Sequence, residues 1–311
     1  MSLKLNQLRA FAEIAECGSI HAASRALGLS QPAVTKALRD LEESLGNQVV
    51  IRGNQGITLT KAGEHLLSHT NLILRELLLA EESVKQCLGN EVGSVNIGLG
   101  ASIACELMPE VICKFRQQYP KVNVKIQEGQ LEAHIDQLRQ GKLDFVINTL
   151  QSNLEYHEFT KHKLTEMPFK IIARKGHPKL KAKTLEELQE CDWVMPTTRS
   201  SYLNTVYDIL SQNGHGLKHA ITCESYLSTL AIITRTDCIG LVSHAAIKHY
   251  TYSNLLEEIE LETPLPWATY YLLCRKASPL TPIANYLAEL FLYQARPLFK
   301  GVNPELQESC R

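Results

Sequence analysis

The 311-residue sequence lacks an unbroken apolar run long enough to cross a membrane. Its first residues show no charged leader followed by an apolar stretch and a small-residue cleavage site, so no secretory signal is predicted. The nine cysteines are scattered and include no C-x-x-C pair, which argues against a disulfide framework and against a zinc finger. These absences predict a protein of the reducing cytoplasm with no membrane partner.

A strong excess of charge is also missing, because 32 Lys and Arg are balanced by 33 Asp and Glu. This balance disfavours a general polycation and a disordered acidic tail. A nucleic-acid binder of this composition needs its basic groups placed locally. The length predicts two or three domains.

The N-terminal segment has the pattern of two capped helices that follow a first helix. Apolar residues at helical spacing predict that first helix over 5–15. Ser19 and Ser30 can each cap a further helix, and Gly28 lies in the turn between the two. Two capped helices joined by such a turn are typical of a helix-turn-helix unit.

The helix after Ser30 has two different faces. Its apolar positions predict one buried stripe, made of Val34, Leu38, Leu41 and Leu45. Gln31, Thr35 and Arg39 lie one residue over from that stripe and should face away from the core. Their amide, hydroxyl and guanidinium groups suit the edges of base pairs in a major groove. The alternative is an ordinary solvated helix face.

The next segments predict a hairpin and a long helix. "QVVIRGNQGITLT", residues 48–60, has two β-rich pieces around a glycine-containing turn and would form a wing beside the helix-turn-helix. Thr60 can cap a helix that ends near Gly89. Its apolar stripe cannot be buried by one helix beside a small domain, so we expect a partner chain; the alternative is packing on the chain's own second half. The stripe contains Leu66, Ile73, Leu77, Ala80, Val84 and Cys87 or Leu88.

After residue 90, strand-like and helix-like segments alternate, which predicts α/β architecture with mostly parallel sheets. Two changes of pattern predict two lobes. The expected organisation is a DNA-binding unit over 1–60, a linker and dimerisation helix over 61–90, and an effector and oligomerisation domain over 91–311. Its first lobe would take about 91–165 and 266–311, and its second lobe about 166–265.

These patterns together resemble a LysR-type transcriptional regulator over the whole chain. The resemblance is carried by residues 8–52 and 57–64, and further on by 107–130 and 138–147. It implies a winged helix-turn-helix, a linker helix, and a two-lobed α/β effector domain similar to periplasmic solute-binding proteins. It also implies a dimer or a tetramer built as a dimer of dimers. The stretch 100–149 resembles the branch that governs aminobenzoyl-glutamate uptake.

The resemblance also implies which residues meet DNA. The expected reading face consists of Gln31, Pro32, Thr35, Lys36 and Arg39. Arg39 could contact either guanine or a phosphate. Phosphate contacts, which position a protein without reading sequence, are expected from Ser30, Arg52 and Thr58.

Strand ends of α/β lobes face a crevice, where helix N-termini favour anions. Residues at such points are predicted to bind the effector: Gly100, Ala101, Ser102, Ile103, Gln130, Asn148, Thr149, Thr198, Ser200, Tyr202 and Glu224. For each of them, a capping or turn role is the alternative. A small organic carboxylate is the expected ligand, whereas Glu224 inside the cleft would favour an amine.

The predicted function is therefore ligand-responsive control of transcription at promoter DNA, with RNA polymerase as a further candidate partner. The alternative is an effector-independent repressor or architectural protein whose α/β domain only builds oligomers. The sequence shows no pairing of a nucleophile with a base that would indicate an enzyme. No cofactor is expected. His65 and His69 have a metal-ligand spacing but no evident third ligand, so no metal site is predicted.

Overall fold

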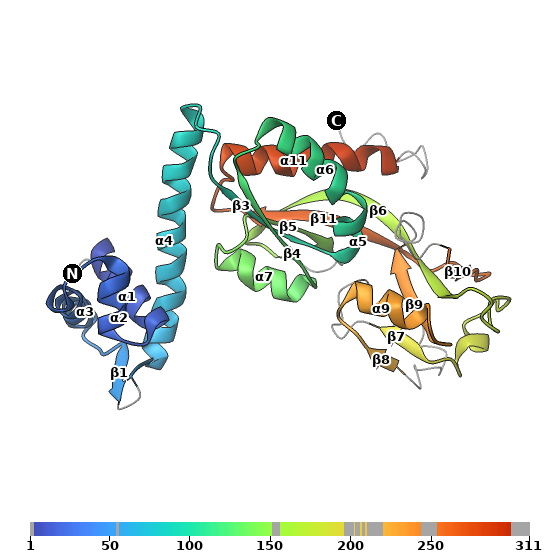
Figure 1. Ribbon diagram of the computed structural model, residues 1–311, viewed down its shortest axis with the longest axis horizontal. Coiled ribbons are helices and arrows are strands. Elements are labelled where there is room, and N and C mark those ends of the chain that lie inside the picture. The colour runs from blue at the N-terminus through green and yellow to red at the C-terminus, as the bar shows by residue number, and fades with distance from the viewer. Residues whose placement is uncertain are drawn as a thin grey trace. The chain divides into compact units, whose positions relative to one another are not determined.

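The computed structural model describes residues 3–53, 56–150, 156–195, 220–243 and 254–299, with the single positions 202, 206 and 209 (Figure 1). The chain divides into two compact units. The first contains Met1–Lys85 and Gln140–Lys142, and the second contains Gln86–Arg139 and Leu143–Arg311.

Three helices form the start of the first unit: α1 (Leu5–Cys17), α2 (Ile20–Leu27) and α3 (Gln31–Leu45). The predicted caps are confirmed. The Ser19 hydroxyl accepts from the Ala22 amide at 3.1 Å, and the Ser30 hydroxyl accepts from the Ala33 amide at 3.4 Å. The turn between α2 and α3 passes through Gly28, whose φ of 64° lies in the left-handed region that glycine tolerates.

The core of this unit lies between α1 and α3. Phe11 and Ile14 of α1 are fully buried, as are Val34, Leu38 and Leu41 of α3. The prediction that Leu45 completes the buried stripe is wrong, because its side chain is 40% exposed. Leu45 is the last residue of α3, directly before the left-handed Gly46, where the helix has run past its partner.

The predicted hairpin is present as β1 (Val50–Gly53) and β2 (Gly56–Leu59), which pair in antiparallel register. Hydrogen bonds join it to the helices. The Glu42 carboxylate accepts from the Val49 and Val50 amides at 2.9 and 3.4 Å, and the Ile57 amide donates to the Gly18 carbonyl at 2.8 Å. The hairpin is thereby held beside the helix-turn-helix, as a wing.

The long helix α4 (Lys61–Cys87) begins where expected, because the Thr60 hydroxyl accepts from the Gly63 amide at 3.0 Å. Several of its apolar side chains are exposed in the single chain, among them Ile73 at 47% and Val84 at 61%. Among the described residues, no helix is long and apolar enough to cross a membrane.

The second unit contains one mixed sheet with two groups of parallel strands. One group consists of β3 (Ser94–Leu99), β4 (Asn123–Glu128) and β5 (Phe145–Thr149). The other consists of β7 (Trp193–Met195), β8 (Ala220–Thr222) and β9 (Ile239–Ser243).

Antiparallel strands join the two groups, so the prediction of mostly parallel sheets is wrong. They are β6 (Phe159–Arg174), β10 (Leu256–Ile259) and β11 (Trp267–Arg275). Residues 159–168 of β6 pair with β11, whereas residues 169–174 pair with β9 and β10. A single long strand therefore belongs to both lobes, and it must run antiparallel to the strands that it joins.

Helices cover both faces of the first strand group (Figure 1). The residues of β5 alternate accordingly, with Phe145 and Ile147 in the core of α6 and α11, and Val146 in the core of α7. The helices of this unit are α5 (Ala101–Glu106), α6 (Met108–Gln118), α7 (Leu131–Arg139), α9 (Tyr226–Ile233) and α11 (Pro282–Phe299), with a short 3-10 turn at Glu186–Leu188.

We expect Gly63→Ala to destabilise the first unit, because an added Cβ would overlap with the carbonyl oxygen of Val49. Overpacking of this kind typically lowers the free energy of unfolding by about 1–3 kcal/mol. Gly53→Ala is the matched control, since its nearest atom would lie 3.9 Å away. Thermal unfolding followed by circular dichroism measures both, and equal melting temperatures would contradict the expectation.

Candidate functional site

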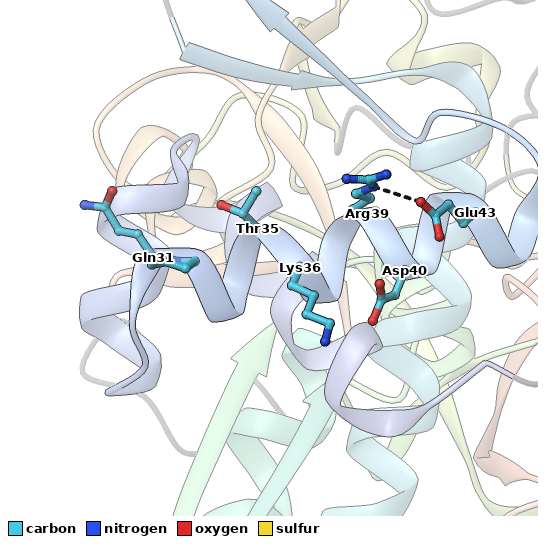
Figure 2. A pocket seen from close by; sticks show the side chains of 7 residues that line it. Gln31, Thr35, Lys36, Arg39, Asp40 and Glu43 are labelled. Carbon is cyan, nitrogen blue, oxygen red and sulfur yellow. Dashed lines mark hydrogen bonds and ion pairs between the residues drawn. The ribbon is translucent and has the colours of Figure 1, made fainter.

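The exposed side of α3 carries a row of polar side chains over a shallow surface depression. Figure 2 shows them projecting from one helix, and the depression is lined by Gln31, Pro32, Thr35, Lys36, Arg39, Asp40 and Glu43. Val34 and Leu38 are fully buried on the opposite side. The whole predicted reading face is thus brought together on an open surface, where its donors can reach a ligand as large as a duplex.

Two carboxylates that sequence reasoning did not single out, Asp40 and Glu43, lie on the same face. The Nε atom of Arg39 donates to Oε1 of Glu43 at 2.8 Å. The two side chains are 77% and 62% exposed, and an ion pair this exposed stabilises a fold only slightly. The i,i+4 spacing could have indicated the pair.

The predicted phosphate contacts lie outside the depression. Ser30 precedes α3, and its hydroxyl oxygen accepts from the Ala33 amide as the cap, which leaves the O–H as a donor. Arg52 is exposed on β1 opposite Ile57, and Thr58 is exposed on β2 opposite Ile51. The hairpin therefore offers its own polar surface beside α3.

The second unit contains a cavity at the carboxyl ends of both groups of parallel strands. Residues after β3 and β4 and at the end of β5 line it from one lobe, and residues after β8 and at the end of β9 line it from the other. Most of the predicted effector residues meet there: Gly100, Ala101, Ser102, Gln130, Asn148, Thr149, Tyr202 and Glu224. Crevices at the carboxyl ends of strands are the usual ligand sites of α/β folds.

Three predicted residues are not placed in this cavity. Ile103 is a correction, because its side chain is fully buried in the hydrophobic core and does not line the cavity. Its amide is also occupied, since it donates to the Gly100 carbonyl at 3.0 Å. Thr198 and Ser200 lie outside the described residues.

Asn148 fastens the strand ends to each other. Its Nδ2 donates to the Gly129 carbonyl at 3.1 Å, and its Oδ1 accepts from the Thr149 amide at 2.9 Å. A Cβ on Gly100 would approach Oδ1 of Asn148 to 2.9 Å, so only glycine fits there without a shift. Asn148 therefore shapes the floor of the cavity.

Sequence reasoning missed these further lining residues: Gly129, Phe169, Tyr226, Thr229, Leu241, Val242, Ser243 and Tyr270. Ser243 ends a predicted strand, so the rule that selected Thr149 could have found it. Its hydroxyl oxygen is buried and has no hydrogen-bond partner among the described residues. Phe169 and Tyr270 come from the antiparallel strands β6 and β11, whose passage through the site the sequence does not predict.

Two of the phenols at the cavity, Tyr202 and Tyr270, remain protonated at neutral pH. Burial raises the pKa of Tyr202 and that of Tyr270, and a hydrogen bond with Ser102 only partly opposes the rise at Tyr270. The Tyr202 hydroxyl donates to the Pro266 carbonyl at 2.9 Å. Glu224 is the charged side chain among the described lining residues, and no Lys or Arg accompanies it there.

In the described ranges, no group of three or more His, Cys, Asp and Glu is arranged to hold a metal ion.

Comparisons with known families match both units. Residues 5–64 match the bacterial regulatory helix-turn-helix proteins of the lysR family, and residues 89–296 match the LysR substrate binding domain. The HTH-type transcriptional regulator TdcA of Escherichia coli is 31% identical over 287 residues, which cover 92% of each chain. PcaQ of Agrobacterium fabrum, another HTH-type transcriptional regulator, is 29% identical over 84% of this chain and 85% of its own.

Solved structures show the same fold. ArgP from Mycobacterium tuberculosis has a TM-score of 0.71 at 17% identity, with 94% of this chain and 97% of that chain covered. CbnR, in full length and complexed with its target DNA, has a TM-score of 0.66 at 18% identity, with 94% and 99% covered. The chain therefore belongs to the LysR family of transcriptional regulators, which join a DNA-binding helix-turn-helix domain to an effector-binding domain.

Proposed function

We propose that this regulator reads promoter DNA with Gln31, Thr35, Lys36 and Arg39 and responds to a small organic carboxylate in the cavity of its second unit. The burial pattern of α3 carries the first part. Because Val34 and Leu38 are fully buried, the donors one residue over must face solvent. An exposed helix with such donors fits a major groove.

The donors suggest distinct roles. Gln31 suits the two hydrogen-bonding groups of an adenine edge, and Arg39 suits the two acceptors of guanine. Thr35 can bond to either base or touch a thymine methyl group. Pro32 borders this face, while Ser30, Arg52 and Thr58 hold phosphates on either side of it and set the register of the helix.

The cavity supports an effector held mainly by neutral donors. The hydroxyl groups of Ser102, Thr149 and Ser243 can donate to a carboxylate, together with the amide of Gln130. The Thr229 hydroxyl is already used, because it donates to the Ser225 carbonyl at 3.1 Å. Glu224 on the other lobe favours a carboxylate that also bears an amine. The exact ligand, including any aminobenzoyl-glutamate-like molecule, stays a prediction.

The exposed apolar residues of α4 support pairing of two chains along this helix, and a dimer of such dimers would give a tetramer. Two linked DNA-binding units are more specific than one, because both half-sites must be present at the right spacing. Once the first unit is bound, the second is held at a high local concentration near its own half-site. We place the protein in the cytoplasm, where the chromosome is, with RNA polymerase as the partner that transmits the response. Catalysis has no part in this proposal, since the relatives are transcriptional regulators.

Arg39→Ala should weaken binding to a specific duplex by about 1–3 kcal/mol if Arg39 reads a base. The specific duplex is selected by the wild-type protein from a random pool, and a scrambled duplex of equal composition is titrated beside it at fixed salt. Arg296→Ala, an exposed arginine of the second unit, is the control. Equal losses on both duplexes would make Arg39 a phosphate contact, and no loss on either would remove it from the interface.

A panel of small carboxylic acids, with and without an amino group, tests the cavity. A ligand raises the melting temperature because it binds the folded state, and we expect a hit to alter DNA binding as well. Ser102→Ala and Ser243→Ala should each weaken the shift, whereas Ser68→Ala on α4 should not. If no acid changes stability or DNA binding, the effector-independent alternative gains support. A full response in both cavity variants would contradict the site.

Ile73→Glu combined with Val84→Glu should separate the paired chains, because charges replace apolar side chains in the proposed helix interface. Sedimentation velocity should show a smaller species, and specific DNA should bind more weakly. Asn71→Glu, at an exposed polar position of the same helix, is the matched control. An unchanged sedimentation coefficient would place the interface elsewhere.

A further inference from the structure

The DNA-reading face of α3 is electrostatically balanced. Lys36 and Arg39 share it with Asp40 and Glu43, so two positive and two negative side chains line one depression (Figure 2). A surface that only gripped phosphates would gain affinity by having no carboxylates, because each one repels the charged backbone of the duplex. The two carboxylates therefore need another explanation.

Glu43 contributes little to the fold. Its contact with Arg39 is an exposed ion pair, which stabilises a folded protein only slightly. The neighbouring Glu42 is different, because its carboxylate accepts the Val49 and Val50 amides at 2.9 and 3.4 Å and joins α3 to the hairpin. A structural role thus accounts for Glu42 and leaves Glu43 unexplained.

The geometry of the pair leaves the outer end of the guanidinium available. Glu43 takes the Nε donor of Arg39, and the two Nη nitrogens have no hydrogen-bond partner among the described residues. Bidentate contact with the O6 and N7 acceptors of guanine needs two donors of the rigid fork. A carboxylate on Nε therefore restrains the side chain without using the two terminal nitrogens.

We propose that Glu43 is a positioning residue that sets DNA specificity: it holds Arg39 for bidentate contact with a guanine edge and repels the phosphate backbone. This inference rests on the proposed role of α3 as the reading face. Restraint before binding lowers the entropy cost of the specific contact, while the negative charge weakens every duplex alike. Glu43 thus lowers the affinity for every duplex but raises the preference for the specific duplex over others.

The test uses the full-length protein, the selected duplex and its scrambled counterpart, over a series of salt concentrations. Glu43→Gln removes the charge and Glu43→Ala removes the contact as well. Both should tighten binding to the scrambled duplex, most strongly at low salt. The ratio of specific to scrambled affinity should fall by about two- to fivefold, the range for an exposed ion pair. In an Arg39→Ala background, Glu43→Ala should leave that ratio unchanged.

Glu110→Gln is the matched control, because Glu110 forms a similarly exposed i,i+4 pair with Lys114 on α6 at 3.0 Å. It should change neither affinity. The inference is overturned if Arg39→Ala lowers the ratio while the Glu43 variants leave it unchanged or raise it; Arg39 then reads DNA without help. If Arg39→Ala changes binding to neither duplex, the proposed function of Arg39 fails first, and the inference falls with it.

Discussion

Burial of one apolar stripe fixes the rotation of α3 about its own axis, and the proposed DNA-reading face depends on that rotation. Val34, Leu38 and Leu41 are fully buried against α1. Each such side chain contributes about 1.5–3 kcal/mol relative to exposure. A turn of the helix that hid Thr35 and Arg39 would expose these residues and bury unpaired polar groups. The core therefore sets which side chains α3 presents to solvent and, in the proposed function, to a duplex.

The residues that line the cavity of the second unit are also selected by the fold. Here the direction of the strands, and not the rotation of a helix, decides which residues meet. Parallel strands end at the same edge of a sheet, so Gly100, Gly129 and Thr149 meet without any attraction between their side chains. The bonds of Asn148 to the Gly129 carbonyl and the Thr149 amide then lock the arrangement. Polar groups are thereby held at a buried surface before any ligand arrives, which lowers the ordering cost of binding.

The sequence predicted those features that depend on short spacings. The caps at Ser19, Ser30 and Thr60 need only a side chain three residues from an amide, and each of these hydrogen bonds is present. The sequence did not predict the features that depend on packing between residues far apart in the chain. Ile103 has the spacing of a strand-end residue, yet its side chain turns into the core. No local pattern in residues 159–168 indicates that they pair with β11, whose partner residues lie 99 to 116 positions later in the chain, so Phe169 and Tyr270 were not expected at the cavity.

Coupling between the two proposed sites would be a matter of thermodynamics. An effector can change DNA binding only by as much as its affinity differs between two states of the protein. The cavity is lined from both strand groups, which β6 and β11 connect, so a ligand that contacts both favours the state in which they lie closest. A single reading helix makes contacts worth about 1–3 kcal/mol each. In the proposed dimer, small changes in the spacing of the two reading helices are then enough to gain or lose an operator, because the second helix binds well only at one separation.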